Sequence, residues 1–433
     1  MASTLLRICT AGSVDDGKST LIGRLLYDSQ SVYEDQLASV EKASKNRTAG
    51  PIDFSLFTDG LRAEREQGIT IDVAYRYFAT SRRKFILADT PGHEQYTRNM
   101  ATGASTADVA ILLVDARHGI LDQSRRHARI ARLLGIKDFV VAVNKMDLVD
   151  FDRDIFEGIA SEFSTLLAGA SVYPIPVSAL LGDNVIEPSP RTPWFTGQSM
   201  LQHLETVEVE SRAALGPLRF PVQVVIRPNQ DFRGYAGQLL SGTVRVGDTI
   251  TAWPSVRSSR VKRIVTWDGD LDVAFAPMSV TLVLEDELDI SRGDMIVDGH
   301  IDMGRRFKAD MVWMDERPLE PNRLYVLKHS SGTTTAQVDT RLLLNDIGNV
   351  TVETSRALIF DRYKDQRGTG AFILIEPTTN FTAGAGMISD PLSDQTPASH
   401  PGVAERLAHL ARSAHSEGEA IEAVRRALEE LLA

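Results

Sequence analysis

The stretch Gly12-Ser-Val-Asp-Asp-Gly-Lys-Ser-Thr20 decides the fold of this chain. It fits the pattern Gly-x-x-x-x-Gly-Lys-Ser/Thr and lies between an apolar run at residues 5–9 and a helical pattern at residues 21–26. A glycine-rich loop between a strand and a helix can turn its backbone N–H groups toward the phosphates of a nucleotide. The stretch therefore predicts an α/β domain with a phosphate-binding loop.

All residues of this loop are expected to bind nucleotide, namely Gly12, Ser13, Val14, Asp15, Asp16, Gly17, Lys18, Ser19 and Thr20. The Lys18 ammonium would supply positive charge at the β- and γ-phosphates, which also makes Lys18 a catalytic candidate. The Ser19 hydroxyl is expected to ligate Mg²⁺. By itself, the loop predicts only that the chain binds a nucleoside triphosphate.

A second motif, Asn144-Lys145-Met146-Asp147, follows an apolar run and predicts which base is bound. The Asp147 carboxylate can accept hydrogen bonds from both N1–H and the exocyclic amine of guanine, whereas adenine offers no such pair of donors. The stem of Lys145 can lie along the base plane, and Asn144 is expected to brace neighbouring loops. A backbone N–H near the guanine O6 is expected from Ser178, Ala179 and Leu180.

Two further motifs lie between these, Gly68-Ile-Thr-Ile-Asp72 and Asp89-Thr-Pro-Gly-His93. Asp89 is expected to hold Mg²⁺ through water, and Thr70 to reach the same ion and so support catalysis. The Gly92 N–H can contact the γ-phosphate, so that both segments relax when hydrolysis removes this group. His93 is interpreted as the residue that orients the attacking water, because phosphoryl transfer depends on positioning. The alternative is an ordinary surface histidine.

Three kinds of sequence pattern follow one another along the chain. Residues 1–215 alternate helical patterns, one of them at 30–49, with apolar runs at 5–9, 84–88, 109–114, 139–143 and 173–177, which is typical of a doubly wound α/β domain. Residues 216–304 and 305–392 contain short alternating runs between turn residues and predict two β-barrels. Residues 393–433 are expected to form a polar linker and a helical tail, because apolar residues recur there with helical spacing.

The composition is that of a globular protein of 433 residues, with 43% hydrophobic and 24% charged residues. The net charge of −11 indicates no general surface for nucleic acid, and a nucleic acid partner is not expected. Cys9 is the only cysteine, which precludes an intrachain disulfide and favours a cytoplasmic location. No apolar stretch approaches the length of a membrane span, so no membrane partner is expected.

The motifs, together with residues 232–248, resemble the translation elongation factor superfamily. This resemblance implies a P-loop GTPase domain followed by two β-barrel domains. Elongation factors typically have a loop of the His-Val-Asp-His-Gly-Lys type, and this chain has Ser13 and Asp16 in place of the histidines.

Longer segments resemble one branch, the large subunits of bacterial sulfate adenylyltransferase, at residues 21–28, 53–68, 96–106, 309–319 and 378–387. The resemblance implies a GTPase that works with a separate small catalytic subunit, which transfers an adenylyl group from ATP to sulfate. It also implies that Val14 and Ile69 flank the attacking water and that Asp15 helps to hold a monovalent cation. The chain has a single Gly-x-x-x-x-Gly-Lys-Ser/Thr motif, so the adenylylsulfate kinase fused to some relatives is not expected.

Two alternatives stay open at this point. A translation-factor-type GTPase that carries aminoacyl-tRNA would have the same fold, although the departures in the phosphate loop and the branch-specific segments count against it. A regulatory GTPase without a metabolic output would share the nucleotide site.

Overall fold

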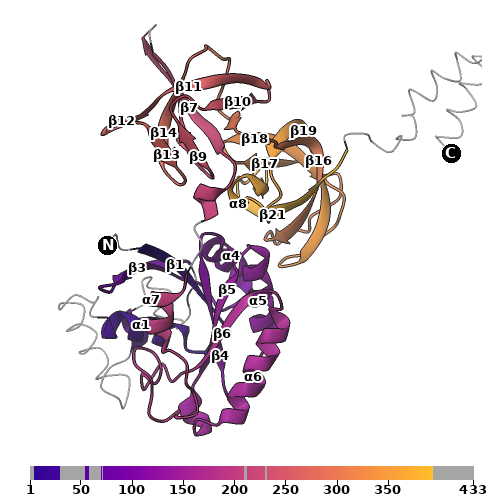
Figure 1. Cartoon of the computed structure of the whole chain (residues 1–433). Helices are drawn as coiled ribbons and strands as arrows, with labels where there is room; N and C mark the ends of the chain where they lie inside the picture. Colours follow the sequence, from indigo (N-terminus) through magenta and orange to yellow (C-terminus); the bar gives the residue numbers. More distant parts are fainter. Residues whose placement is uncertain are drawn as a thin grey trace, which may run out of the picture.

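The computed structural model describes residues 4–29, 54–57, 70, 72–208, 212–229 and 232–393. An α/β domain comes first along the chain, and two β-domains follow it (Figure 1). The helical patterns at residues 30–49 and in the C-terminal tail lie outside the described residues. Within the described ranges, no helix is both long and apolar enough to cross a lipid bilayer.

The sheet of the α/β domain has six strands in the order β2-β3-β1-β4-β5-β6. Neighbouring strands are parallel except at one edge, where β2 pairs antiparallel with β3. The five predicted apolar runs correspond to the five parallel strands. The bounds are β1 Thr4–Ala11, β2 Ala74–Ala79, β3 Arg83–Asp89, β4 Val109–Asp115, β5 Asp138–Asn144 and β6 Ser171–Pro176.

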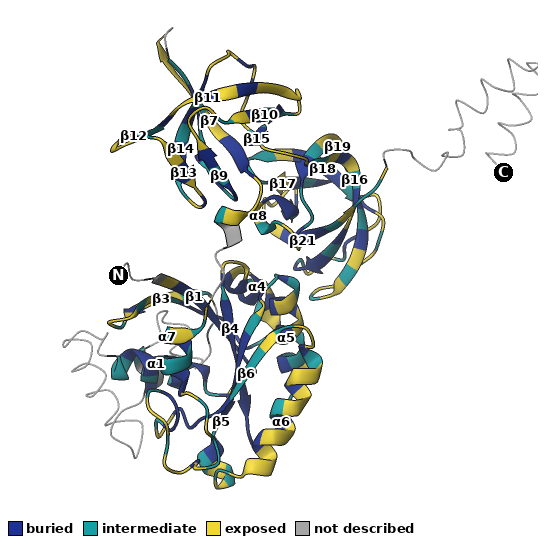
Figure 2. Cartoon of the chain, in the orientation of Figure 1, coloured by how far each residue is buried: buried dark blue, intermediate teal, exposed yellow. Residues whose placement is uncertain are grey.

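Helices cover both faces of this sheet, so its central strands are buried on both sides (Figure 2). Along β4, Val109, Ile111 and Leu113 pack in one core with residues of α1 and α7, whereas Ala110, Leu112 and Val114 pack in a second core with residues of α4, α5 and α6. The helices are α1 Lys18–Asp28, α4 Thr97–Ser105, α5 Asp122–Leu133, α6 Arg153–Leu166 and α7 Met200–Thr206. Short 3-10 helices are η1 Phe54–Phe57, η2 Glu94–Tyr96, η3 Met146–Val149 and η4 Arg212–Leu215.

The first β-domain contains a sheet in the order β10-β15-β7-β8-β14-β11-β12, and the additional pairing of β10 with β11 closes six of these strands into a ring. Strands β9 and β13 form a separate pair. The bounds are β7 Arg219–Asn229, β8 Phe232–Gln238, β9 Thr243–Arg245, β10 Thr249–Trp253, β11 Arg257–Thr266, β12 Gly269–Leu271, β13 Val273–Phe275, β14 Ser279–Leu284 and β15 Met295–Val297.

The second β-domain is a closed barrel in the order β16-β19-β18-β17-β20-β21. Its first strand begins at Asp302, a few residues before the expected domain start at 305. The bounds are β16 Asp302–Trp313, β17 Tyr325–His329, β18 Gly332–Val338, β19 Ile347–Phe360, β20 Ala371–Ile375 and β21 Thr382–Pro391, with the short helix α8 Arg367–Gly370 before β20.

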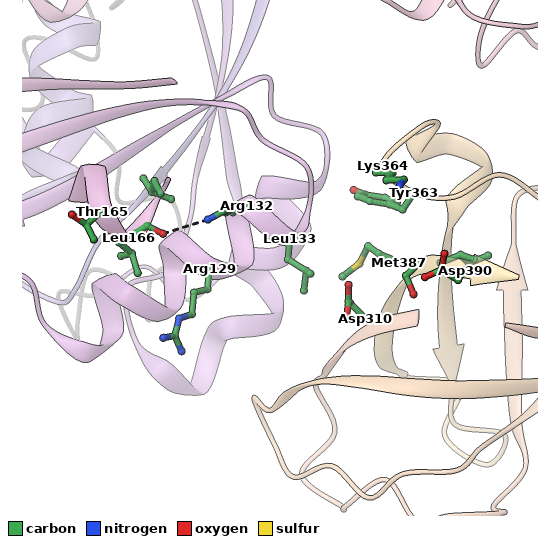
Figure 3. Close-up of a pocket in the computed structure, with 13 residues that line it drawn as sticks. Arg129, Arg132, Leu133, Thr165, Leu166, Asp310, Tyr363, Lys364, Met387 and Asp390 are labelled. Carbon is green, nitrogen blue, oxygen red and sulfur yellow. Dashed lines mark hydrogen bonds between the residues drawn. The ribbon is translucent and has the colours of Figure 1, made fainter. Parts of the chain in front are cut away.

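The segment around α8 joins all three domains. Tyr363 donates a hydrogen bond from its hydroxyl to the Leu134 carbonyl at 2.8 Å, just after α5. Asp361 accepts a bidentate pair from Arg219 of the first β-domain, at 2.7 and 2.8 Å. Between the α/β domain and the closed barrel lies a cleft of about 710 Å³, with Leu133 and Leu166 on one side and Met387 on the other (Figure 3).

Candidate nucleotide-binding site

Three of the four predicted motifs, those at residues 12–20, 89–93 and 144–147, converge at the carboxyl edge of the parallel sheet. Thr10 of β1 pairs in register with Asp89 of β3, and Asp115 of β4 pairs with Asn144 of β5. The loops that follow these strands therefore start side by side. This is the edge at which open α/β sheets bind their ligands.

The phosphate loop curls as its sequence predicts. Asp15 and Gly17 have positive φ angles of 68° and 93°, and α1 starts directly afterwards at Lys18. Ser19 and Thr20 are half-buried in the first turn of this helix. A helix N-terminus behind a curled loop directs backbone N–H groups toward an anion.

The Lys18 ammonium is buried over this loop. Its Nζ donates to the carbonyls of Gly12 and Ser13 at 2.9 and 2.8 Å. Burial lowers the pKa of Lys18, and the nearby carboxylates of Asp89 and Asp16 oppose this shift only in part. The Gly92 backbone lies close to the Lys18 ammonium. A Cβ added at Gly92 would be only 2.3 Å from Lys18 Nζ. The motifs of β1 and β3 are thus in contact around one cation.

The Asp16 side chain stabilises the loop internally. Its Oδ2 accepts a hydrogen bond from the Ser13 backbone N at 2.6 Å. Burial raises the pKa of the Asp16 carboxyl, and it outweighs the Ser13 hydrogen bond and the Lys18 charge, which both lower this pKa. Val14 and Asp15, by contrast, are exposed at the tip of the loop.

Asn144 braces two neighbouring loops, as expected. Its Nδ2 donates to the Asp16 carbonyl at 2.7 Å, and its Oδ1 accepts from the Ala179 backbone N at 2.9 Å. Among the three residues expected near O6, Ala179 therefore gives its N–H to Asn144. Ser178 is buried, and Leu180 is 59% exposed.

The remaining residues of the base motif lie beside this brace. Lys145 has a positive φ of 61°, and its Nζ donates to the Asp15 carbonyl at 2.5 Å. Asp147 is half-buried in η3. The phosphate loop and the base motif are therefore linked by both Asn144 and Lys145.

The expected metal ligands provide oxygen donors. Asp89 is buried at the end of β3, and Ser19 and Thr70 are half-buried. In the described part of the chain, no group of three or more His, Cys, Asp or Glu residues could hold a metal ion alone. Such a sparse set of hard oxygen ligands fits Mg²⁺, which usually completes its octahedron with water and substrate phosphates. Gly68 and Ile69 lie outside the described residues.

His93 is half-buried just after Gly92. Its Nδ1 accepts from the Gln95 backbone N at 3.4 Å, and its ring centroid lies 6.1 Å from that of Tyr96. The imidazole thus contacts the turn of η2.

The structure adds polar residues that no motif includes. On α5, the Ser124 hydroxyl lies 3.3 Å from that of Ser13, and His127 is fully buried with its Nε2 2.8 Å from Gln123 Nε2. Asp115 contacts Lys145 with Oδ2 2.9 Å from Nζ. The position of Asp115 at the end of an apolar run is the one signal in the sequence that could have indicated it.

The fold and this site define a guanine-nucleotide-binding protein of the elongation factor type. Residues 3–240 match the family described as Elongation factor Tu GTP binding domain, and residues 339–389 match the family described as GTP-eEF1A C-terminal domain-like. Over nearly its whole length, the chain belongs to the more specific family of proteins named Sulfate adenylyltransferase subunit 1.

Its relatives in that family are similar along most of both chains. The protein from Vibrio vulnificus strain YJ016 is 54% identical over 420 residues, which cover 92% of this chain and 88% of the relative. The protein from Bacteroides thetaiotaomicron is 53% identical, with 89% and 86% covered. The protein from Teredinibacter turnerae is 53% identical, with 90% and 88% covered.

Proposed function

We propose that this chain is the GTP-hydrolysing large subunit of sulfate adenylyltransferase, which couples GTP hydrolysis to the synthesis of adenosine 5′-phosphosulfate by a separate small subunit. The observation that carries this proposal is the convergence of three of the motifs at one sheet edge, in a chain more than half identical to proteins named Sulfate adenylyltransferase subunit 1. The domains would comprise residues 1–215, 216–304 and 305–392, followed by a tail at 393–433.

The loop from Gly12 to Thr20 would hold the phosphates of GTP. The Lys18 ammonium donates hydrogen bonds to two carbonyls of the loop. A triphosphate would offer it anionic oxygens, which are stronger acceptors. Ser19, Thr70 and Asp89 would hold Mg²⁺, directly or through water. When bound, this ion neutralises charge that develops on the phosphates.

The base site would be formed by the loops after β5 and β6. Asp147 would accept from guanine N1–H and N2–H₂, while the stem of Lys145 covers the base plane. Because Ala179 donates to Asn144, the N–H of Leu180 is the better candidate for guanine O6 among the three residues of that loop.

Hydrolysis of GTP by water would depend on positioning. His93 would orient the attacking water, with Val14 and Ile69 on either side, and Asp15 would contribute to a site for a monovalent cation. Gly92 and Thr70 would lose contacts when the γ-phosphate leaves. Two segments of the chain would then relax together.

Coupling requires that the small subunit bind the GTP and GDP states with different affinity. The small subunit would transfer the adenylyl group of ATP to sulfate and release pyrophosphate. This transfer creates a phosphosulfate anhydride, and its free energy change is unfavourable. The free energy of GTP hydrolysis can drive this step, which explains why a GTPase would take part in the reaction. The pair would work in the cytoplasm.

The test is reconstitution with the small subunit encoded in the same genome. We expect the two chains to co-purify and sulfate-dependent release of pyrophosphate from ATP to rise when GTP is added. No GTP stimulation in a well-folded pair would contradict the proposal. A gel shift with aminoacyl-tRNA would instead favour a translation factor.

A further inference from the structure

Asp115 is a buried carboxylate at the edge of the nucleotide site. It is the last residue of β4, its side chain is 3% exposed, and it pairs in register with Asn144. A carboxylate at this depth costs free energy unless cations and donors satisfy it. The partners of Asp115 therefore indicate what this residue does.

Two cationic side chains share the Asp115 carboxylate. Arg117 donates to Oδ1 from its backbone N and from Nε, both at 3.0 Å, and to Oδ2 from Nη2 at 2.6 Å. Lys145 Nζ lies 2.9 Å from Oδ2, and His118 Nδ1 lies 3.6 Å from the same oxygen. Burial raises the pKa of Asp115, but the hydrogen bonds from Arg117 and Lys145 outweigh burial and hold the pKa well below its usual range.

Lys145 connects this carboxylate to the phosphate loop. Its Nζ contacts both Asp115 Oδ2 and the Asp15 carbonyl, at 2.9 and 2.5 Å. Two fixed contacts for one ammonium determine the direction of the flexible stem behind it. Without them, the lysine would lose rotamer freedom when nucleotide binds, and binding would weaken.

We propose that Asp115 is a positioning residue of the nucleotide site, which holds the stem of Lys145 in place for the face of the guanine base before nucleotide binds. This inference rests on the proposed GTP-binding function. Asp115 acts through Lys145, whose stem would contact the guanine base, and this base is present in both GTP and GDP. It therefore strengthens the binding of both nucleotides and leaves the choice of base to Asp147.

The first test is Asp115→Asn in the full chain. An amide of the same shape removes the charge and gives Lys145 a weaker acceptor. We expect calorimetry with Mg²⁺ to give a Kd about tenfold higher for both GDP and GTP. In GTP hydrolysis, KM should rise while kcat stays within about twofold. An unchanged Kd would overturn the proposal.

Two comparisons separate positioning of Lys145 from general support of the fold. His118→Ala removes the ring that lies 3.6 Å from Oδ2 and leaves the contacts of Arg117 and Lys145, so nucleotide affinity should not change. In a Lys145→Ala background, Asp115→Asn should cause almost no further loss, because the two residues act as a unit. An equal loss with His118→Ala, or additive losses in the double variant, would overturn the proposal.

Folding of each variant is checked by circular dichroism. If Asp115→Asn does not fold, Asp115→Glu keeps the charge and displaces it by one methylene, and it should raise both Kd values by about the same factor. An unchanged Kd for that folded variant would overturn the proposal as well. Failure of the unmodified chain to bind GDP or GTP would instead contradict the proposed function.

Discussion

His93 and Gly92 are neighbours that the sequence assigns to different tasks, and their surroundings differ accordingly. Gly92 is packed against Lys18 and the phosphate loop, whereas His93 is half-buried and its imidazole contacts η2. The role of His93 in orienting the attacking water stays a prediction, which substitution of this residue tests.

We expect the His93→Ala variant to bind GTP with unchanged affinity and to hydrolyse it about a hundredfold more slowly, because the attacking water is no longer oriented. Single-turnover hydrolysis and calorimetry measure the two quantities. His300→Ala, at a side chain that is 84% exposed in the barrel region, is the matched control. An unchanged rate in His93→Ala would remove this residue from the mechanism.

Asp147→Asn should shift the preference of the site from guanine to xanthine nucleotides. The amide can donate to the xanthine 2-oxo group, and it no longer accepts both hydrogen bonds from guanine. Competition binding of GDP against XDP measures the shift. If guanine selectivity survived intact, the assignment of the base site would be wrong.

His127 should make stability depend on pH. Burial, with the charges of Lys18 and Arg126, lowers its pKa to about 3, so the folded chain keeps it neutral while the unfolded chain protonates it near its ordinary value. Stability is therefore lost as the pH falls below about 6.5, by about 2 kcal/mol between pH 7 and pH 5. Urea unfolding of nucleotide-free protein should show this loss, and His127→Gln should remove it. The same slope in both proteins would contradict the assignment.

Among single residues, the motifs predict the candidates for ligand binding and one brace, Asn144, but they do not include every polar residue that contacts them. Asn144 was predictable because its motif is contiguous. Asp115 and Ser124 reach the site only because β4 ends beside β5 and α5 starts near the phosphate loop. Such contacts depend on tertiary packing, which spacing in the sequence does not encode.

At the scale of elements, the phosphate loop depends on Gly17. Its φ is 93°, and a Cβ there would lie 2.4 Å from Asn144 Nδ2. Gly17→Ala should therefore strain the loop and displace the brace, with at least a tenfold loss of GDP affinity. Gly158→Ala is the control, because a Cβ at that position in α6 meets no atom within 4 Å. Equal affinities in the two variants would show that the loop tolerates this change.

The most deeply buried strands of the α/β sheet were the easiest to predict. β4 is buried along its whole length and reads as one apolar run. β2 lies at the sheet edge with Tyr75 and Tyr77 exposed, so its sequence lacks such a run. Its antiparallel pairing with β3 was therefore not apparent from the sequence.

At the scale of the whole molecule, the predicted order of an α/β domain and two β-barrel domains is confirmed. The contacts between domains were not predictable, because Tyr363 and Leu134 are far apart in sequence and neither belongs to a motif. These contacts link the end of α5 to the closed barrel. The start of α5 contacts the phosphate loop through Ser124.

Tyr363→Phe should loosen this junction, because the buried Leu134 carbonyl loses its hydrogen bond at a cost of about 1 kcal/mol. Hydrogen exchange at the C-terminal turn of α5 should become about fivefold faster. Tyr235→Phe removes a hydroxyl bond to the Leu288 carbonyl within the first β-domain and should leave α5 unchanged. Equal exchange at α5 in all three proteins would show that the junction does not depend on this bond.

The proposed function requires a site that binds guanosine triphosphate with magnesium, and titration calorimetry of the full chain measures this binding. With Mg²⁺ present, GTP and GDP should bind, and ATP should bind at least a hundredfold more weakly. Equal affinities for GTP and ATP in well-folded protein would contradict a guanine-specific site and the function proposed from it.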